Sequence, residues 1–230
     1  MRTWLAVARG HLVDRKDYTS VPWGVLAFAF LVSLIVFAAV PMSAGSDRST
    51  GAVSSFYIFY FVLGILSMTR SLPFALMLGV SRRAYFAGTA LLALTMAAVY
   101  GLGQAVLQVV ERATGGWGVE MHMFRVNYLM PGPWYATWLT SAVLLIVLYL
   151  YGMWYGIVYR RWSVYGELAF IAAQLTAALI AVLAVTWSHG WPSVGRFFNT
   201  LTGIGLTGLL AALAVMLLAG GYATMRRVTV

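Results

Sequence analysis

The sequence contains no cysteine and very little charge. The absence of cysteine excludes disulfides, thiolate metal sites and cysteine nucleophiles. Charged residues make up 9% of the 230 residues and hydrophobic residues 62%, which leaves too little polar surface to cover a water-soluble globule of this size. The composition therefore indicates an integral membrane protein.

Ionisable side chains are also missing from the long apolar stretches. A membrane-spanning helix needs about 20 mostly apolar residues, and six stretches qualify: 22–41, 53–69, 85–108, 135–158, 168–187 and 200–221. None of them contains Asp, Glu, Lys, Arg or His; Glu167 lies at the edge of the fifth and Glu111 at the end of the third. Ion-coupled transporters and voltage sensors place such groups within the membrane, so the sequence offers little for coupling to an ion gradient.

Enzyme motifs are absent as well. The chain has no H-E-x-x-H metal motif, no G-x-S-x-G nucleophile motif and no G-x-x-x-x-G-K-[ST] phosphate loop, so it cannot hydrolyse ATP by phosphate-loop chemistry. We expect no catalytic residue, cofactor-binding residue or metal ligand in this chain. Met121, His122 and Met123 beside Glu120 suggest a soft-metal site as an alternative, although ordinary loop packing is the simpler interpretation.

Basic residues predict the orientation. The net charge of +9 falls in small groups beside the apolar stretches, as topology determinants do, which argues against nucleic-acid binding. Six crossings put both termini on one side. That side carries Arg2, Arg9, Arg15, Lys16, Arg70, Arg82, Arg83, Arg160, Arg161, Arg226 and Arg227, and the other carries Arg48, Arg112, Arg125 and Arg196. Since cytoplasmic segments hold the excess of Lys and Arg, both termini are predicted to be cytoplasmic and the loop 109–134 to face outward.

Residues 2–14 place Trp4, Leu5, Ala8 and Leu12 on one helical stripe. This spacing predicts an amphipathic helix in the inner membrane interface. A frayed tail is the alternative interpretation.

The spans contain mild polar groups, small residues and many aromatic rings. Each glutamine is expected to hydrogen-bond a neighbouring helix, and the G-x-x-x-G of Gly152 and Gly156 allows close packing within this chain or with a second copy. Packing and an interfacial belt account for the aromatic rings. The functional alternative is a path for an amphipathic substrate, lined by Tyr57, Tyr60, Gln104, Gln108, Tyr151, Tyr155 and Gln174.

The segment RSLPFALMLGVSRRAYF, residues 70–86, predicts a short helix between the second and third spans. Ser71 can cap its start, Pro73 suits a first turn, and Gly79 can end it in the left-handed conformation. Ser81 can then cap the next helix. The apolar turn around Phe74 needs a cover, which is either the membrane surface or a groove on a cytoplasmic protein.

The order of these elements and the loop PFALMLGVSRRAYFAGT resemble the permease subunit of a bacterial type-2 ABC exporter. The resemblance implies an all-α integral membrane protein with six transmembrane helices, an N-terminal interfacial helix and a short cytoplasmic coupling helix between spans 2 and 3. It implies a single transmembrane domain, 1–230, made of a connecting helix at 1–19, a six-span bundle at 22–221 and a cytoplasmic tail at 222–230. In that family short re-entrant helices often lie between spans 5 and 6, for which only residues 187–199 are available here.

The resemblance also implies partners. The coupling element, residues 71–83, is expected to dock on a separate ABC ATPase subunit that binds ATP and Mg, through Pro73, Phe74, Met77, Leu78, Arg82 and Arg83. A second permease chain, identical or related, is expected to complete the pathway within the lipid of a bacterial cytoplasmic membrane. An alternative from another class is a non-transporting scaffold or sensor subunit that recruits a cytoplasmic partner through the same helix.

Overall fold

The computed structural model describes residues 20–39, 49–124 and 133–225 of the chain. Its α-helices are α2 (Val21–Ala39), α3 (Ser54–Leu66), α4 (Leu72–Met77), α5 (Arg82–Ala113), α6 (Trp134–Trp187), α7 (Trp191–Thr200) and α8 (Gly203–Met225). Three short helical turns join them: η2 (Gly51–Val53), η3 (Ser67–Ser71) and η4 (Gly116–Glu120). The expected all-α fold is confirmed for these parts of the chain. The helix expected within 1–19 and the tail residues 226–230 lie outside the described residues.

In the part of the chain that the structure describes, five helices are long and apolar enough to cross a membrane: Val21–Ala39, Gly51–Met77, Arg82–Ala113, Trp134–Trp187 and Gly203–Thr224. This finding supports a multi-pass membrane protein. The sequence predicts separate helices at 135–158 and 168–187, whereas the structure joins them in α6, which is interrupted only by a non-helical backbone at Ser163 (φ 59°, ψ −157°).

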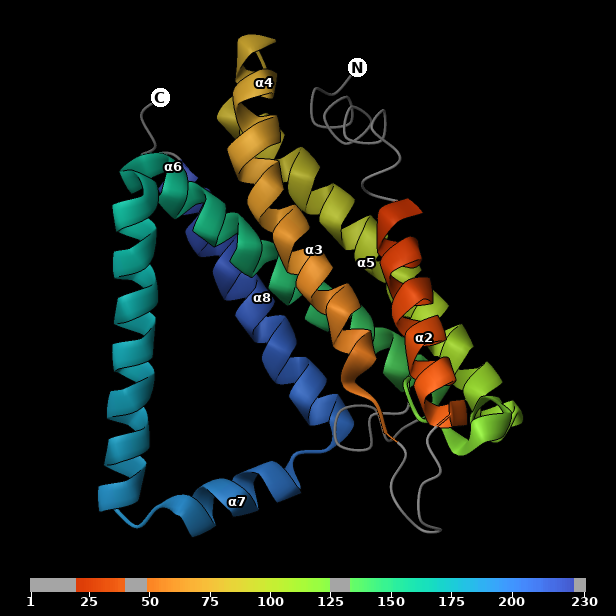
Figure 1. Ribbon diagram of the computed structural model, residues 1–230. Coiled ribbons are helices and arrows are strands. Elements are labelled where there is room, and N and C mark those ends of the chain that lie inside the picture. The colour runs from red at the N-terminus through yellow and green to blue at the C-terminus, as the bar shows by residue number, and fades with distance from the viewer. Residues whose placement is uncertain (1–19, 40–48, 125–132, 226–230) are drawn as a thin grey trace.

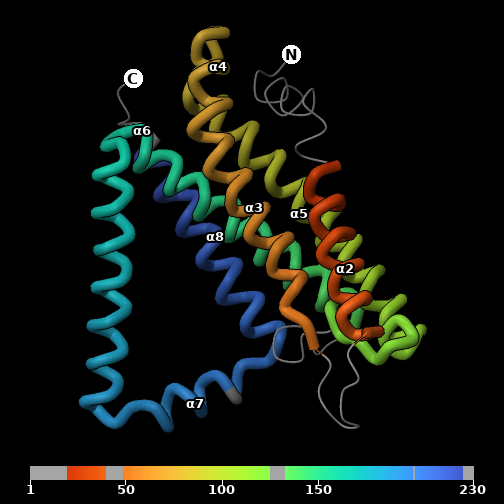
Figure 2. Tube along the Cα trace, viewed as in Figure 1, coloured from red at the N-terminus to blue at the C-terminus, as the bar shows by residue number. Residues whose placement is uncertain are grey.

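The long helices alternate in direction along the chain (Figures 1 and 2). α2, α3, α5 and the part of α6 before Ser163, here called the first arm, form a bundle. The part after Ser163, the second arm, runs back apart from the bundle, and α7 connects its far end to α8. The beginning of α2, α4, the α6 break and the end of α8 lie at one end of the molecule, the α4 end, and η4 and α7 lie at the other, the η4 end.

Glycine allows α3 and the first arm of α6 to pack closely. A Cβ atom on Gly152 would collide with the carbonyl oxygen of Phe61, and one on Gly64 with the carbonyl oxygen of Tyr149. One on Gly156 would lie 2.6 Å from Cβ of Met68. The G-x-x-x-G pair therefore packs within this chain, which resolves one of the two alternatives that the sequence left open.

The core is aromatic and lies between α2, α3, α5 and the first arm of α6. The rings of Phe56 and Tyr60 on α3 meet Tyr100 on α5 edge to face, with centroids 5.4 and 5.9 Å apart, and Tyr149 of α6 lies 5.3 Å from Tyr60. α8 packs on the outside of the first arm, where the buried hydroxyls of Thr140 and Thr207 lie 2.7 Å apart.

The second arm of α6 exposes apolar side chains all round. Its exposed residues include Leu168, Leu175, Leu179, Ile180 and Leu183. A helix with such a surface is stable in lipid, where its backbone groups are satisfied internally, and is costly in water. This arm supports the membrane character of the fold.

Candidate functional site

α4 is a continuation of α3 (Figure 1). The backbone stays helical from Leu66 through Ser71, and the N–H of Leu72 donates to the carbonyl oxygen of Ser67 through the π-helical turn η3. Ser71 makes no side-chain capping bond. The prediction that Ser71 caps a separate helix is wrong, because the preceding turn already supplies backbone acceptors for the N–H groups of α4.

The turn after α4 agrees with the sequence prediction. Gly79 has φ of +79°, its N–H donates to Leu76 O at 3.0 Å, and the N–H of Val80 donates to Ala75 O at 3.1 Å. These two bonds form a Schellman motif, which needs a left-handed residue. Ser81 then accepts a hydrogen bond from the N–H of Ala84 at 3.3 Å and caps α5. The turn returns the chain directly from α4 to α5.

Large apolar side chains are exposed at this turn. Phe74, Met77 and Leu78 are 61%, 79% and 68% exposed. The other three predicted contact residues are close in sequence on either side of the turn: Pro73 and Arg82 are half-buried and Arg83 is exposed. We call these six residues the α4 tip. It presents an apolar projection beside two guanidinium groups.

Further arginines lie at the α4 end of the molecule. Arg160 Nη1 donates to the carbonyl oxygen of Thr69 at 3.4 Å, and the guanidinium of Arg161 lies 4.6 Å from the ring centroid of Trp162. Within the described residues, the single approach of a carboxylate to a basic side chain is that of Glu111 to His122 at the η4 end. Carboxylates of that part of the chain therefore do not neutralise the arginines of the α4 end, which suits a partner surface of negative charge.

Four of the predicted pathway residues lie together in the closed core. Tyr57, Tyr60, Gln104 and Gln108 are at most 8% exposed. The hydroxyl of Tyr57 donates to Oε1 of Gln104 at 2.6 Å and also hydrogen-bonds Ser141 on α6. The expected role of Gln104 in holding neighbouring helices together is thus confirmed. This group is therefore closed to a substrate in the present conformation.

The other three pathway residues join the two arms of α6. The hydroxyls of Tyr151 and Tyr155 on the first arm both donate to Oε1 of Gln174 on the second arm, at 2.6 and 2.9 Å. The ring of Tyr155 also meets Phe61 on α3 and Phe170 on the second arm, at 5.5 and 5.2 Å. The two tyrosines and the glutamine are half-buried, so this group, unlike the core group, is accessible in the present conformation.

The alternative soft-metal site at Met121, His122 and Met123 does not form. Both methionines are fully buried in the core, whereas His122 is half-buried in an extended segment, where successive side chains point to opposite sides. Over the described residues there is also no group of three or more His, Cys, Asp and Glu residues that could hold a metal ion.

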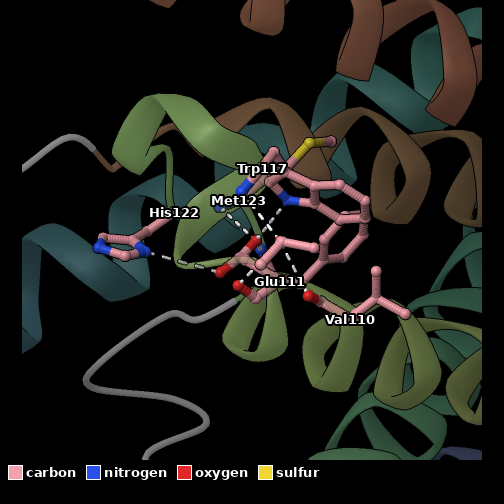
Figure 3. Close-up of polar contacts among 7 residues, drawn as sticks. Val110, Glu111, Trp117, His122 and Met123 are labelled. Carbon is pink, nitrogen blue, oxygen red and sulfur yellow. Dashed lines mark hydrogen bonds and ion pairs between the residues drawn. The ribbon is translucent and has the colours of Figure 1, made fainter.

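Glu111 is a buried residue to which the sequence assigned no role. It is 1% exposed, and Oε2 accepts hydrogen bonds from Trp117 Nε1 at 3.3 Å and from the N–H groups of Met123 and Phe124, each at 2.9 Å (Figure 3). A carboxylate in the last turn of α5 opposes the helix macrodipole. This unfavourable position, which is visible in the sequence, is the one signal from which specific partners of Glu111 could have been predicted.

The helices and their exposed apolar faces define a multi-pass α-helical membrane protein. No family model, curated protein or solved structure matches the chain.

Proposed function

We propose that the chain is the permease subunit of an ATP-driven ABC exporter in a bacterial cytoplasmic membrane, moving an apolar or amphipathic substrate. A separate ATPase subunit, which holds ATP and Mg, binds the α4 tip. The observation that carries this proposal is the exposure of Phe74, Met77 and Leu78 at the end of a helix that continues into a membrane-length helix. Burying each of these side chains stabilises a complex by about 1.5 to 3 kcal/mol. Binding of a protein groove that covers all three is therefore strongly favourable.

The direction of α4 supports docking on a protein over resting on the membrane. α4 projects from the end of the bundle along α3 and does not lie across the bundle end (Figure 1). The tip is therefore carried away from the apolar surface of the spans, toward a cytoplasmic partner.

The α4 tip is also mechanically connected to the core. In addition to the Tyr57–Gln104 bond, two buried hydrogen bonds join α5 to α3 and its continuation η3: Tyr85 donates to the carbonyl oxygen of Ser67 on η3, and Tyr60 on α3 donates to that of Ala93. A partner that displaces the tip would move α3 and α5 together. The core group of Tyr57 and Gln104 would then move relative to the first arm of α6, where Tyr57 also hydrogen-bonds Ser141.

The length of α6 supports six crossings. Its 54 residues span about 80 Å at 1.5 Å per residue, whereas the hydrocarbon of a bilayer is about 30 Å thick. Arg160, Arg161 and Glu167 flank the break at Ser163, so the break suits the membrane surface, and each arm suits one crossing.

The same arrangement supports cytoplasmic termini. Of the arginines in the described residues, Arg70, Arg82, Arg83, Arg160 and Arg161 lie at the α4 end, and Arg112 and Arg196 lie at the η4 end. By the positive-inside rule, this distribution supports a cytoplasmic α4 end. The beginning of α2 and the end of α8 lie on that side.

We assign the substrate path to the region between the two arms of α6, where Tyr151, Tyr155 and Gln174 are accessible. A second permease chain, identical or related, packs against the exposed apolar second arm and completes the path. The aromatic, uncharged lining suits an apolar or amphipathic substrate.

The docking assignment is tested by the double variant Phe74→Asp/Met77→Asp, purified from the native host with a tag on the chain. We expect it to lose the co-purifying ATPase by at least about 100-fold, since two buried apolar contacts are replaced by unpaired charges. The matched control is Val164→Asp/Tyr165→Asp, because these residues are also exposed and next to the α6 break at the same end. The assignment is contradicted if the ATPase still co-purifies with the tip variant. It is also contradicted if the control variant loses the ATPase to the same extent.

A further inference from the structure

Only one of the two carboxylate oxygens of Glu111 has hydrogen-bond partners. Its Oε2 accepts hydrogen bonds from three N–H groups of the segment 117–124. Oε1 is buried and has no hydrogen-bond partner among the described residues. An unsatisfied oxygen on a buried carboxylate is costly, and such groups are usually paired in folded proteins.

A second buried polar atom without a hydrogen-bond partner lies opposite Oε1 of Glu111. Nδ1 of His122 is buried, also has no hydrogen-bond partner there, and lies 3.8 Å from Oε1 of Glu111 (Figure 3). This distance exceeds that of a hydrogen bond, about 2.7 to 3.2 Å, and a small rotation of the imidazole would close it. The ring is half-buried, so protons of the surrounding water can reach it.

Three helices meet at this pair. Glu111 belongs to α5, the carbonyl oxygen of His122 accepts from the N–H of Thr50 just before α3 at 2.9 Å, and Trp117 meets Phe30 of α2 edge to face, 4.7 Å between centroids. The segment 116–124, here called the η4 loop, therefore fastens α2, α3 and α5 to one another at their η4 end.

We propose that Glu111 and His122 form a proton-binding site that tightens the η4 loop when His122 is doubly protonated. Histidine gains its second proton between about pH 8 and 5. Nδ1 then donates to Oε1 in a charge-assisted hydrogen bond. When His122 is neutral, Nδ1 either faces the carboxylate with its lone pair, so that this bond is absent, or donates in a weaker hydrogen bond without the imidazolium charge.

Few other charges lie on the elements packed around the site. In the described residues they are Arg112 beside Glu111 on α5 and Glu120 on η4, both exposed side chains, while α2 and residues 49–53 carry no ionisable side chain. The protonation of His122 is therefore the change of charge that tightens the η4 loop in this proposal.

In the proposed exporter this site is on the outer face, where the η4 loop would respond to external pH; that placement rests on the proposed function. The site itself does not depend on an ATPase or a substrate. It is tested on the full chain alone in detergent, so failure of the docking assignment and failure of this inference are separate results.

The measurement is amide hydrogen exchange of the peptide covering 117–124 at pH 5.5 and 8.0, with labelling times scaled for the intrinsic rate. The N–H groups of Met123 and Phe124 report directly, since they donate to Glu111. We expect about tenfold stronger protection at pH 5.5, as a hydrogen bond to a charged group typically contributes. In His122→Asn, whose amide reaches the Nδ1 position without titrating, the ratio between the two pH values falls to about one.

The control is His189→Asn, because His189 is the other histidine of the described residues and lies at the opposite side of the η4 end, between α6 and α7. It should keep the wild-type ratio. Equal protection of the wild type at both pH values overturns the proposal, and so does a pH dependence that persists in His122→Asn or disappears in His189→Asn.

Discussion

The hydroxyl of Tyr57 on α3 donates a 2.6 Å hydrogen bond to Oε1 of Gln104 on α5, and both side chains are buried. The bond lies on the two helices that meet at the α4 tip. Nε2 of the same Gln104 is buried without a partner among the described residues. The contact is thus a buried link between α3 and α5 within an incompletely satisfied interior, which suits two helices that move as one unit when the α4 tip is displaced.

Removing this link should weaken the bundle. We expect Tyr57→Phe to lower the free energy of unfolding in detergent by about 0.6 to 1.7 kcal/mol, the range measured for interhelical hydrogen bonds in membranes. Tyr135→Phe is the control, because Tyr135 is 56% exposed. Equal thermal stability of Tyr57→Phe and wild type would show that the bond contributes nothing.

A second prediction concerns the close contact between α3 and α6. A methyl group on Gly152 meets the carbonyl oxygen of Phe61, whereas nothing lies within 4 Å of the Cβ position of Gly208 on α8. Gly152→Ala should therefore destabilise the fold by about 1 to 3 kcal/mol, as overpacking does. Gly208→Ala should be neutral or stabilising, because alanine favours helix. Similar melting temperatures for the two variants would contradict the packing described here.

How much of this structure is predictable depends on how local each feature is. The turn at Gly79 and Ser81 was predicted because a left-handed glycine and a capping serine act within a few residues. Pro73 lies in the first turn of α4, as predicted. The continuity of α3 into α4 was missed, because a π-helical turn already provides the acceptors that a capping Ser71 would have supplied.

Features that depend on distant contacts were not predictable. Ser163 adopts a positive φ without being glycine, and nothing in the local sequence required it. The partners of Glu111 lie 6 to 13 residues along the chain, and their approach depends on how the η4 loop packs on α2. For the same reason, the predicted pathway residues gave no indication that they separate into a closed core group and an accessible group.

The link between the two arms of α6 can be tested with paired labels. Because the chain has no cysteine, cysteines at the exposed residues Leu139 and Leu183 place one nitroxide on each arm. Gln174→Leu removes the acceptor of both tyrosine hydroxyls, so the distance distribution between the labels should broaden. Thr176→Val should leave it unchanged, since that hydroxyl bonds only Ala172 of its own helix. A distribution that Gln174→Leu leaves as narrow as in the wild type would contradict this role.

The arginines of the α4 tip should make partner binding sensitive to salt. We expect Arg82→Glu/Arg83→Glu to weaken ATPase binding by about tenfold or more at low ionic strength, and to reduce the loss of affinity seen when salt is added. Arg196→Glu reverses an exposed charge at the η4 end and should have no effect. Titration of the ATPase onto each variant at two salt concentrations measures the affinity and its salt dependence. Unchanged binding by the tip variant would show that the arginines do not contact the ATPase.

The most direct test of the account is site-specific photocrosslinking from Met77 in the native host, with Tyr165 as the reference position, since both side chains are strongly exposed at the α4 end. If the α4 tip docks on an ATPase, the adduct from Met77, identified by mass spectrometry, will be a protein with a phosphate-loop ATPase sequence, and the adduct from Tyr165 will be much weaker. A Met77 position that crosslinks only to lipid, or to a protein without an ATPase sequence, would contradict the exporter assignment.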